Sequence, residues 1–425
     1  MTDRQNPAAD LHAPFAGSFY DTQDLPPWDF YEDVRAAGDV VWDAGMNAWL
    51  VVGYELAREV LRHDQLYAHP YANMGATAAW LKVRSNNPRS FHFLSGEQHK
   101  AMHRWYMQDL LSPTWVEKYR PVLVDEVVRH SLTRLAGRSS FEVFGDFAEW
   151  IPLGVFARLL GLPDDDDTLL RIRRLNDVIA EFTILANALK LERDPSPADL
   201  KIAADAALAG QELDALLMPV VKARRAGTGD DFVSRLWAGG PAIFADWNEM
   251  DTLDACRRLL FAGTDTTTHA IANVFYMLLT DTDLLARVRA GDASIVERFI
   301  EEALRLNGSV QFRPRRLSAD TTLNGVPLKA GDMVVVFLLA ANRDAAHYAC
   351  PHAVDLARDK PRDHIAFNYG IRTCLGAALA RAELAAAVTQ ALALFPTLRL
   401  DATAPAPRPL GLLRRTYRPL HVRVD

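Results

Sequence analysis

The sequence predicts a mainly helical protein with a smaller β-rich part, an α+β architecture. Helical periodicity extends over residues 115–225, and residues 253–278 have the pattern of one long helix. Strand-type runs rich in valine and tryptophan are short, and they occur at 40–52 and 334–337. Apolar residues make up 49% of the 425 residues, which is enough to form a large core.

Charge and cysteine content narrow the possible classes of protein. The net charge of −7 argues against nucleic acid as the main partner. Three cysteines form no disulfide framework, which favours a reducing cytoplasm. Residues 1–20 are expected to form an irregular arm without a signal peptide, and the longest apolar run, 333–341, is too short for a bilayer. We therefore expect a soluble cytoplasmic protein that contacts neither a membrane nor nucleic acid.

The N-terminal segment alternates helix and strand patterns. A helix is expected at 28–37, a hairpin between 40–42 and 49–52, and a second helix at 54–63. The stretch 65–94 shows no periodicity, although its aromatic residues argue against disorder. Irregular stretches of this length are usually functional.

A helix that begins after Gly96 carries two histidines. His99 and His103 are one turn apart and therefore lie on the same helix face. Two such histidines are a common metal-binding arrangement, but no third ligand follows at the spacing of a zinc site.

The helical region 115–225 contains one predicted break, at 161–164. The four acidic residues at 164–167 are expected to cap the next helix and to complement its dipole, with a metal site as the weaker alternative. A loop with two prolines is expected at 192–199.

The long helix at 253–278 contains residues that disfavour a regular helix. Gly263 costs about 1 kcal/mol relative to alanine. Four threonines at 264, 266, 267 and 268 compete for backbone carbonyls. Two interpretations follow: a kink or π-bulge that opens a groove, or the end of one helix and the start of another that is capped by threonine.

Residues 297–306 form another predicted helix, in which Glu302 and Arg305 share a face. An ordinary surface ion pair, which contributes a few tenths of a kcal/mol, would explain them. Short strands are expected at 315–320 and 334–337, and a hairpin at 410–424 closes the chain.

The chain is organised around a glycine-rich loop that contains Cys374 and precedes a run of strong helix formers. Gly370 suits a turn with positive φ, and Gly376 leaves room for a flat ligand. A helix N-terminus favours the thiolate of Cys374, and such a thiolate is a good axial ligand for haem iron. Phe367 would cover the sulfur, and Arg372 would pair with a haem propionate. The alternative is a buried structural thiol.

The pattern F-x-x-G-x-x-x-C-x-G resembles the haem-binding loop of the cytochrome P-450 family. Residues 262–266 resemble that family's A-G-x-[DE]-T motif, and Glu302 with Arg305 resembles its E-x-x-R motif. The three motifs stand in the family's order and close to its spacing. Asn368 and Arg372 depart from the Gly and His of many bacterial members, but arginine keeps a cation for the propionate.

The resemblance implies a single domain over residues 1–425 that holds haem b, iron protoporphyrin IX, between the long helix and the helix that follows the cysteine. It implies that Cys374 is the axial ligand of the iron. His99 matches a propionate ligand of the family, and His103, beside Arg104, stands where the family has arginine. The full set of cofactor-binding residues that it implies is Cys374, His99, His103, Arg315, Arg372, Phe367, Gly370, Gly376, Ala262 and Gly263.

The resemblance also implies residue roles in catalysis and folding. Asp265 and Thr266 would be catalytic and pass protons to bound dioxygen. Glu302, Arg305 and Arg358 would be structural and hold the cysteine side together. The substrate-pocket candidates by family position are Tyr71, Trp80, Phe91, Phe182, Leu185, Phe261, Val310, Phe312 and Leu412. Taken singly, each of these is better explained by a place in the core than by a substrate contact.

The implied reaction is insertion of one oxygen atom of O2 into a small, mostly apolar organic substrate, with aromatic compounds among the candidates, by hydroxylation or O-dealkylation. The electron donor would be a separate ferredoxin or flavodoxin-type protein with its NAD(P)H reductase, because the chain has neither a dinucleotide-binding fingerprint nor a cysteine cluster. We expect a monomer.

Three alternatives remain at this point. A peroxygenase driven by peroxide would lack the acid–alcohol pair, so Asp265 and Thr266 count against it. A non-catalytic haem-thiolate protein that binds a ligand is the second. The third is a zinc protein with the ligands Cys350, His352, His347 and Cys374, whose spacing fits no common zinc motif.

Overall fold

The structure is a computed structural model that describes residues 19–70, 87–187 and 196–425. The chain divides into two compact units. The first, called the sheet unit, comprises residues 1–70, 273–374 and 405–419. The second, called the helical unit, comprises residues 71–272, 375–404 and 420–425. The single domain expected over the whole chain stays a prediction.

The sheet unit contains a five-stranded sheet with the strand order β1-β2-β8-β5-β3. Strand β2 pairs with β8 in parallel, and the other neighbours are antiparallel. The hairpin expected near the N-terminus is confirmed as β1 and β2. The strand bounds are β1 Val40–Asp43, β2 Ala48–Val51, β8 Met333–Phe337, β5 Phe312–Leu317 and β3 Tyr67–Ala68.

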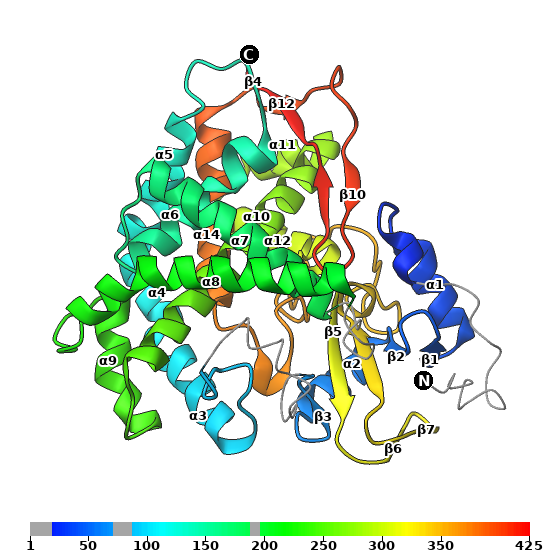
Figure 1. Ribbon diagram of the computed structural model, residues 1–425. Coiled ribbons are helices and arrows are strands. Elements are labelled where there is room, and N and C mark those ends of the chain that lie inside the picture. Colours follow the sequence, from blue (N-terminus) through cyan, green and yellow to red (C-terminus); the bar gives the residue numbers. More distant parts are fainter. Residues whose placement is uncertain (1–18, 71–86, 188–195) are drawn as a thin grey trace. The chain divides into compact units, whose positions relative to one another are not determined.

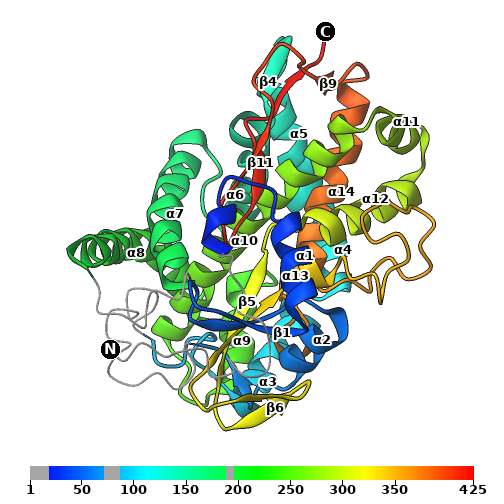
Figure 2. The ribbon, with the colours of Figure 1, turned by 90° about the vertical axis from the view of Figure 1, so that its right-hand side faces the viewer.

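The two faces of this sheet pack against different helices. Residues that pair across neighbouring strands share a face. Trp49, Val51 and Val336 belong to the same core cluster as Val60 of α2, Tyr54–Arg62, and α2 lies beside the sheet (Figure 2). On the opposite face Phe337 contacts Phe19, with ring centroids 4.8 Å apart. Phe337 also contacts the rings of α1, Trp28–Ala37.

The remaining elements of the sheet unit are short helices and hairpins. The turn between β6 and β7 has positive φ at Asn324 (47°) and Gly325 (82°), as a tight hairpin requires. Their bounds are η1 Phe19–Thr22, α11 Thr282–Ala290, α12 Ala293–Asn307, β6 Thr321–Leu323, β7 Val326–Leu328, α13 Leu338–Ala341, η7 Gly370–Arg372, β10 Arg408–Leu410 and β11 Thr416–Arg418.

The helical unit contains most of the long helices. Helices α7 and α8 pack against each other (Figure 1). The α-helix bounds are α3 Gly96–Trp105, α4 Pro113–Arg120, α5 Glu126–Thr133, α6 Trp150–Leu159, α7 Asp166–Asn187, α8 Pro197–Ala223, α9 Phe232–Ile243, α10 Glu249–Thr280, whose last turns belong to the sheet unit, and α14 Ala377–Leu394. Segments η3 Tyr106–Leu110, η4 Pro121–Asp125 and η5 Val143–Ala148 are π-helical.

Two boundaries differ from the sequence prediction. The expected helical region 115–225 contains strand β4, Ser140–Glu142, and that prediction is wrong there. Strand β4 pairs with β12, His421–Arg423, which also pairs with β9, Arg399–Leu400. The closing hairpin is therefore formed by β10 and β11 alone. Local periodicity does not show that a short segment will pair with the far end of the chain.

Among the described residues, one helix is long and apolar enough to cross a bilayer by length and composition. This is α14, and half of its length is buried inside the structure. A core helix of a water-soluble protein gives the same pattern.

Candidate active site

The residues singled out in the sequence belong to two separate groups. The cysteine loop and its arginines lie in the sheet unit, and the middle of α10 and the histidines of α3 lie in the helical unit. Each group is described by itself.

The cysteine loop is held in shape by its backbone. Gly370 has φ +72°, which confirms the predicted positive φ, and a Cβ there would lie 2.9 Å from the carbonyl oxygen of Leu61. Asn368 also has positive φ (68°), and its Nδ2 donates to the carbonyl of Arg372 at 2.8 Å. Asparagine tolerates this conformation better than other side chains do.

The same loop presents Cys374 just ahead of α14. The backbone N–H of Cys374 donates to the carbonyl of Phe367 at 2.8 Å. Residues 366–376 are all partly exposed, and Cys374 is among them. The cysteine that fits a buried structural thiol is instead Cys256, which is 1% exposed within α10.

Arg315 in β5 is a buried cation whose hydrogen-bonding capacity is only partly used. Its side chain is 1% exposed, and Nη1 donates to the carbonyl of Pro314 at 2.9 Å. Its Nε and Nη2 have no hydrogen-bond partner among the described residues. Burial, together with the nearby charges of Arg372 and Arg313, lowers the pKa of Arg315 to about 9. An incompletely paired buried guanidinium is costly, so this position fits an anionic group such as a haem propionate.

Arg372 has a protein partner that sequence reasoning missed. It forms a two-pronged ion pair with the buried carboxylate of Asp64, in which Nη2 lies 3.1 Å from Oδ2. Asp64 follows α2, and only the fold brings it to the loop. The propionate contact expected for Arg372 stays a prediction.

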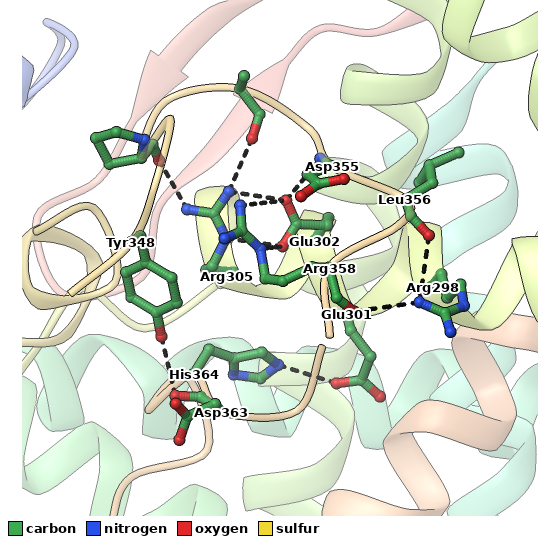
Figure 3. Close-up of polar contacts among 12 residues, drawn as sticks. Arg298, Glu301, Glu302, Arg305, Tyr348, Asp355, Leu356, Arg358, Asp363 and His364 are labelled. Atoms are coloured by element: carbon green, nitrogen blue, oxygen red, sulfur yellow. Dashed lines mark hydrogen bonds and ion pairs between the residues drawn. The ribbon is translucent and has the colours of Figure 1, made fainter. Parts of the chain in front are cut away.

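Glu302 and Arg305 form a fully buried pair, which excludes an ordinary surface ion pair (Figure 3). Arg305 Nε and Nη2 each donate to one oxygen of Glu302 at 2.8 Å. Arg358 Nε donates to the same carboxylate at 2.9 Å, and the N–H of Asp355 donates to it at 2.8 Å. The structural grouping of Glu302, Arg305 and Arg358 expected from the motif is present.

The remaining donors of Arg305 reach the segment that leads to the cysteine loop. They bind the carbonyls of Asn342 (3.0 Å), Pro351 (2.7 Å) and Ala353 (2.8 Å). Burial alone would raise the pKa of Glu302, but the hydrogen bonds from Arg305, Arg358 and Asp355 outweigh it and hold the pKa below its ordinary value. The carboxylate is therefore ionised in the folded protein near neutral pH.

In the helical unit, α10 is one α-helix from Glu249 to Thr280, which confirms the long helix expected at 253–278. It excludes the end of one helix and the start of another within that range, and it contains no π-helical turn. The kink stays a prediction. The threonine hydroxyls donate to carbonyls four residues earlier, from Thr264 to Leu260 at 2.7 Å and from Thr266 to Ala262 at 2.8 Å. The helix therefore satisfies these hydroxyls without ending.

Gly263 has a packing function in this helix. A Cβ at this position would lie 2.0 Å from Cζ of Phe156 on α6. The glycine therefore allows the two helices to approach closely. The cofactor contact expected for Gly263 stays a prediction.

One stripe of α10 remains accessible between buried positions. Ala262 is exposed, and Asp265, Thr266 and His269 are partly exposed, whereas Leu260 is buried. Spacings of three, four and seven residues place these positions on one face. His269 Nε2 lies 3.8 Å from Oδ1 of Asp265. Asp265 and Thr266 thus share an accessible face, as the motif requires.

The two histidines of α3 stack in an aromatic cluster. His99 is completely buried, and its ring lies 4.4 Å from that of Phe91 and 5.9 Å from that of His103. Their predicted common face is confirmed.

The substrate-pocket candidates differ in their packing. Phe312 lies in the aromatic core with Phe19 and Phe337, which favours a core role. Phe91 stacks on His99. The other described candidates are Phe182, Leu185 and Val310, which are buried, and Phe261 and Leu412, which are partly exposed. Tyr71 and Trp80 lie outside the described residues.

The zinc alternative is not supported. No group of three or more His, Cys, Asp or Glu side chains within the described ranges could hold a metal ion. His347 stacks on Tyr54 and contacts Asp363, and His352 lies 3.4 Å from Arg343.

Comparison with known proteins identifies similar chains. The family model described as cytochrome P-450 matches residues 13–421. Cytochrome P-450 105C1 of a Streptomyces species is 33% identical, with 85% of this chain and 84% of that protein covered. Cytochrome P-450 monooxygenase PikC of Streptomyces venezuelae is 30% identical, with 88% and 85% covered. The crystal structure of CYP109B1 from Bacillus subtilis has a TM-score of 0.77 at 25% identity and covers 94% of this chain and 99% of that one.

The buried carboxylate of Glu302 generates a stability prediction. Glu302→Gln leaves two buried guanidinium groups without their counter-charge, and we expect a loss of about 3–5 kcal/mol in the free energy of unfolding. Denaturant titration at neutral pH measures this loss. The matched control is Glu297→Gln on the exposed face of the same helix, which should change stability by less than about 0.5 kcal/mol.

The pH dependence of this difference has a defined sign. Because the folded pKa of Glu302 is lowered, its contribution is fully present above the ordinary value of 4.5 and is lost as the pH falls through the folded value. The stability gap between the wild type and Glu302→Gln should therefore narrow in acid. A gap that is small at neutral pH, or that does not change with pH, would contradict the assignment.

Proposed function

Because the chain belongs to the cytochrome P-450 family of monooxygenases, we propose that it inserts one oxygen atom of O2 into a small, mostly apolar organic substrate, by hydroxylation or O-dealkylation. The observation that carries this proposal is the presence of two features in one unit: a partly exposed Cys374 and a buried, incompletely paired Arg315. A single thiolate ligand and a cation for a propionate are what an iron porphyrin needs from the protein.

The family implies a haem cofactor, and we assign it as haem b with Cys374 as the axial ligand. When bound, haem supplies the redox chemistry that activates O2. Arg315 pairs with a propionate, and the Asp64–Arg372 ion pair fixes the loop beside it. The remaining assigned cofactor contacts are His99, His103, Phe367, Gly370, Gly376, Ala262 and Gly263.

Asp265 and Thr266 carry the proton in this proposal. Thr266 Oγ1 donates its own proton to the carbonyl of Ala262, so the hydroxyl is held in one orientation with its oxygen free to accept another proton. Asp265 lies one residue earlier on the same accessible stripe and takes protons from the solvent side. His269 is one turn further along and holds a second titratable group near that carboxylate. This assignment makes general acid–base transfer the task of α10.

The family also implies an electron donor and a substrate. We assign the donor as a separate ferredoxin or flavodoxin-type protein served by an NAD(P)H reductase, and the protein as a cytoplasmic monomer that functions as one domain. Exposed cations near the cysteine loop suit an acidic partner. Arg362 is 66% exposed, although its Nε lies 3.3 Å from Glu301, and Lys360 is exposed.

The assignment of the iron ligand predicts a spectroscopic loss. Cys374→Ser should abolish the red-shifted Soret band of the ferrous–CO adduct, because serine does not supply a thiolate. Cys256→Ala and Cys350→Ala are the matched controls and should keep that band. A normal ferrous–CO spectrum in Cys374→Ser would refute the proposed function.

The proton-transfer assignment predicts a separation of binding from turnover. Thr266→Ala should leave the substrate-induced spectral shift unchanged while more of the electrons consumed appear as hydrogen peroxide. Asp265→Asn should lower kcat by about 10²–10⁴-fold. Thr267→Ser is a suitable control, because Thr267 is buried on another face of α10. If the fraction of electrons that ends in product were the same in both variants and in the wild type, Asp265 and Thr266 would have no part in proton transfer.

The donor assignment predicts an electrostatic effect on reduction. Lys360→Glu should raise the apparent KM for the donor protein without changing haem content, and added salt should reduce the difference from the wild type. Lys329→Glu, on an exposed lysine of the β6–β7 hairpin region, controls for net charge. Substrate turnover by the purified protein with NAD(P)H alone would exclude a separate donor.

A further inference from the structure

One face of α12 bonds the segment that leads to the cysteine loop, and it includes an acid that the sequence motif did not identify. Arg298, Glu301 and Arg305 are three and four residues apart, so they share that face. Arg298 Nη1 donates to the carbonyl of Leu356 at 3.3 Å. Glu301 contacts the same segment nearer to the cysteine, at His364 (Figure 3).

Glu301 and His364 form a buried pair. The side chain of His364 is 1% exposed, and that of Glu301 is 4% exposed. Nε2 of His364 lies 2.9 Å from Oε2 of Glu301. On the other side of the ring, Nδ1 accepts a hydrogen bond from the backbone N–H of Ala366 at 3.2 Å. Because Nδ1 is the acceptor, the ring hydrogen lies on Nε2 and is donated to Glu301.

The bond to Ala366 holds the backbone at the point where the cysteine loop begins. Ala366 directly precedes Phe367, and the carbonyl of Phe367 accepts the N–H of Cys374 at 2.8 Å. The imidazole also lies near Phe367 itself, with ring centroids 6.2 Å apart. If Ala366 lost its acceptor, a shift of the backbone to find another partner would move Phe367 and strain its bond to Cys374.

Other contacts hold the residues on either side of His364. The hydroxyl of Tyr348 donates to the carbonyl of Asp363 at 2.9 Å. The N–H of Ile365 donates to Oδ1 of Asn342 at 2.8 Å. A substitution of His364 should therefore release Ala366 locally and leave the rest of the segment in place.

We propose that His364 is a positioning residue for the iron ligand, and that Glu301 orients its ring. The imidazole holds Phe367 and Cys374 in the geometry in which the thiolate is presented to iron. Hydrogen bonds around the ligands of a metal commonly set their orientation in this way. The inference rests on the proposed haem-thiolate function and refines it.

Two substitutions separate the two bonds of the imidazole. Glutamine places its amide nitrogen near the position of Nε2, so His364→Gln keeps the donor to Glu301 and loses the acceptor for Ala366. Asparagine places its amide oxygen near the position of Nδ1, so His364→Asn keeps the acceptor and loses the donor. Both remove the aromatic ring, so each variant is the matched control of the other.

The main readout is the ferrous–CO adduct of the haem-loaded protein, followed over time. We expect His364→Gln to lose the red-shifted Soret band about 10-fold faster than the wild type, and His364→Asn to keep the wild-type rate within about twofold. In denaturant titration the order should be reversed. His364→Asn should be the less stable variant, because the buried carboxylate of Glu301 loses a donor. His352→Gln, at an exposed histidine of the same unit, should change neither measurement.

The order of the two variants distinguishes positioning from general stabilisation. A residue that only stabilises the fold would give faster band loss in the less stable variant. Band loss that is faster in His364→Asn, or equal in the two variants, would therefore overturn the proposal.

A second pair of variants keeps the test decisive if a substitution of His364 does not fold. Glu301→Gln keeps an acceptor for the Nε2 hydrogen and should keep the band, whereas Glu301→Leu should lose it about as fast as His364→Gln. The same rate in both Glu301 variants would refute the inference. A wild-type protein without the red-shifted band would instead mark failure of the proposed function.

Discussion

The segment that leads to the cysteine loop depends on the ion pairs and hydrogen bonds of the Glu302 carboxylate. It is completely buried, and it receives hydrogen bonds from two guanidinium groups and one backbone N–H. Through Arg305 the same group holds the carbonyls of Pro351 and Ala353, which belong to the segment that leads to the cysteine loop. Burying these charges carries a desolvation penalty, and removing one partner would leave a buried charge unpaired. The cluster therefore contributes mainly by holding that segment in one geometry.

The buried arginines of the sheet unit fall into two kinds. Arg305 and Arg358 share Glu302, Arg372 has Asp64, and Arg415 binds backbone carbonyls. Arg315 differs, because its Nε and Nη2 have no hydrogen-bond partner among the described residues. Where the charge serves folding, the chain supplies its own partner, and the open donors of Arg315 are the ones that the proposed cofactor would use. This contrast connects the fold to the proposed cofactor.

Helix α10 shows why local propensity misjudged one element. Gly263 and the neighbouring threonines disfavour a helix when each is considered alone. In the fold, the threonine hydroxyls bind carbonyls of the previous turn, and Asn176 of α7 donates to Thr264 at 2.8 Å. The glycine is required by the ring of Phe156. Packing therefore keeps the helix continuous and leaves one accessible stripe with Asp265 and Thr266.

The sequence by itself determined the helix-rich class, the N-terminal hairpin and the positive φ of Gly370, because these depend on local periodicity and turn chemistry. Cys374, Asp265 and Glu302 were singled out because their motifs resemble those of a known family. Only the tertiary structure decided which charges are compensated. Asp64 reaches Arg372, and β4 reaches β12, across long stretches of chain. No local pattern contains these contacts, since they arise from strand pairing and from burial that brings distant segments together.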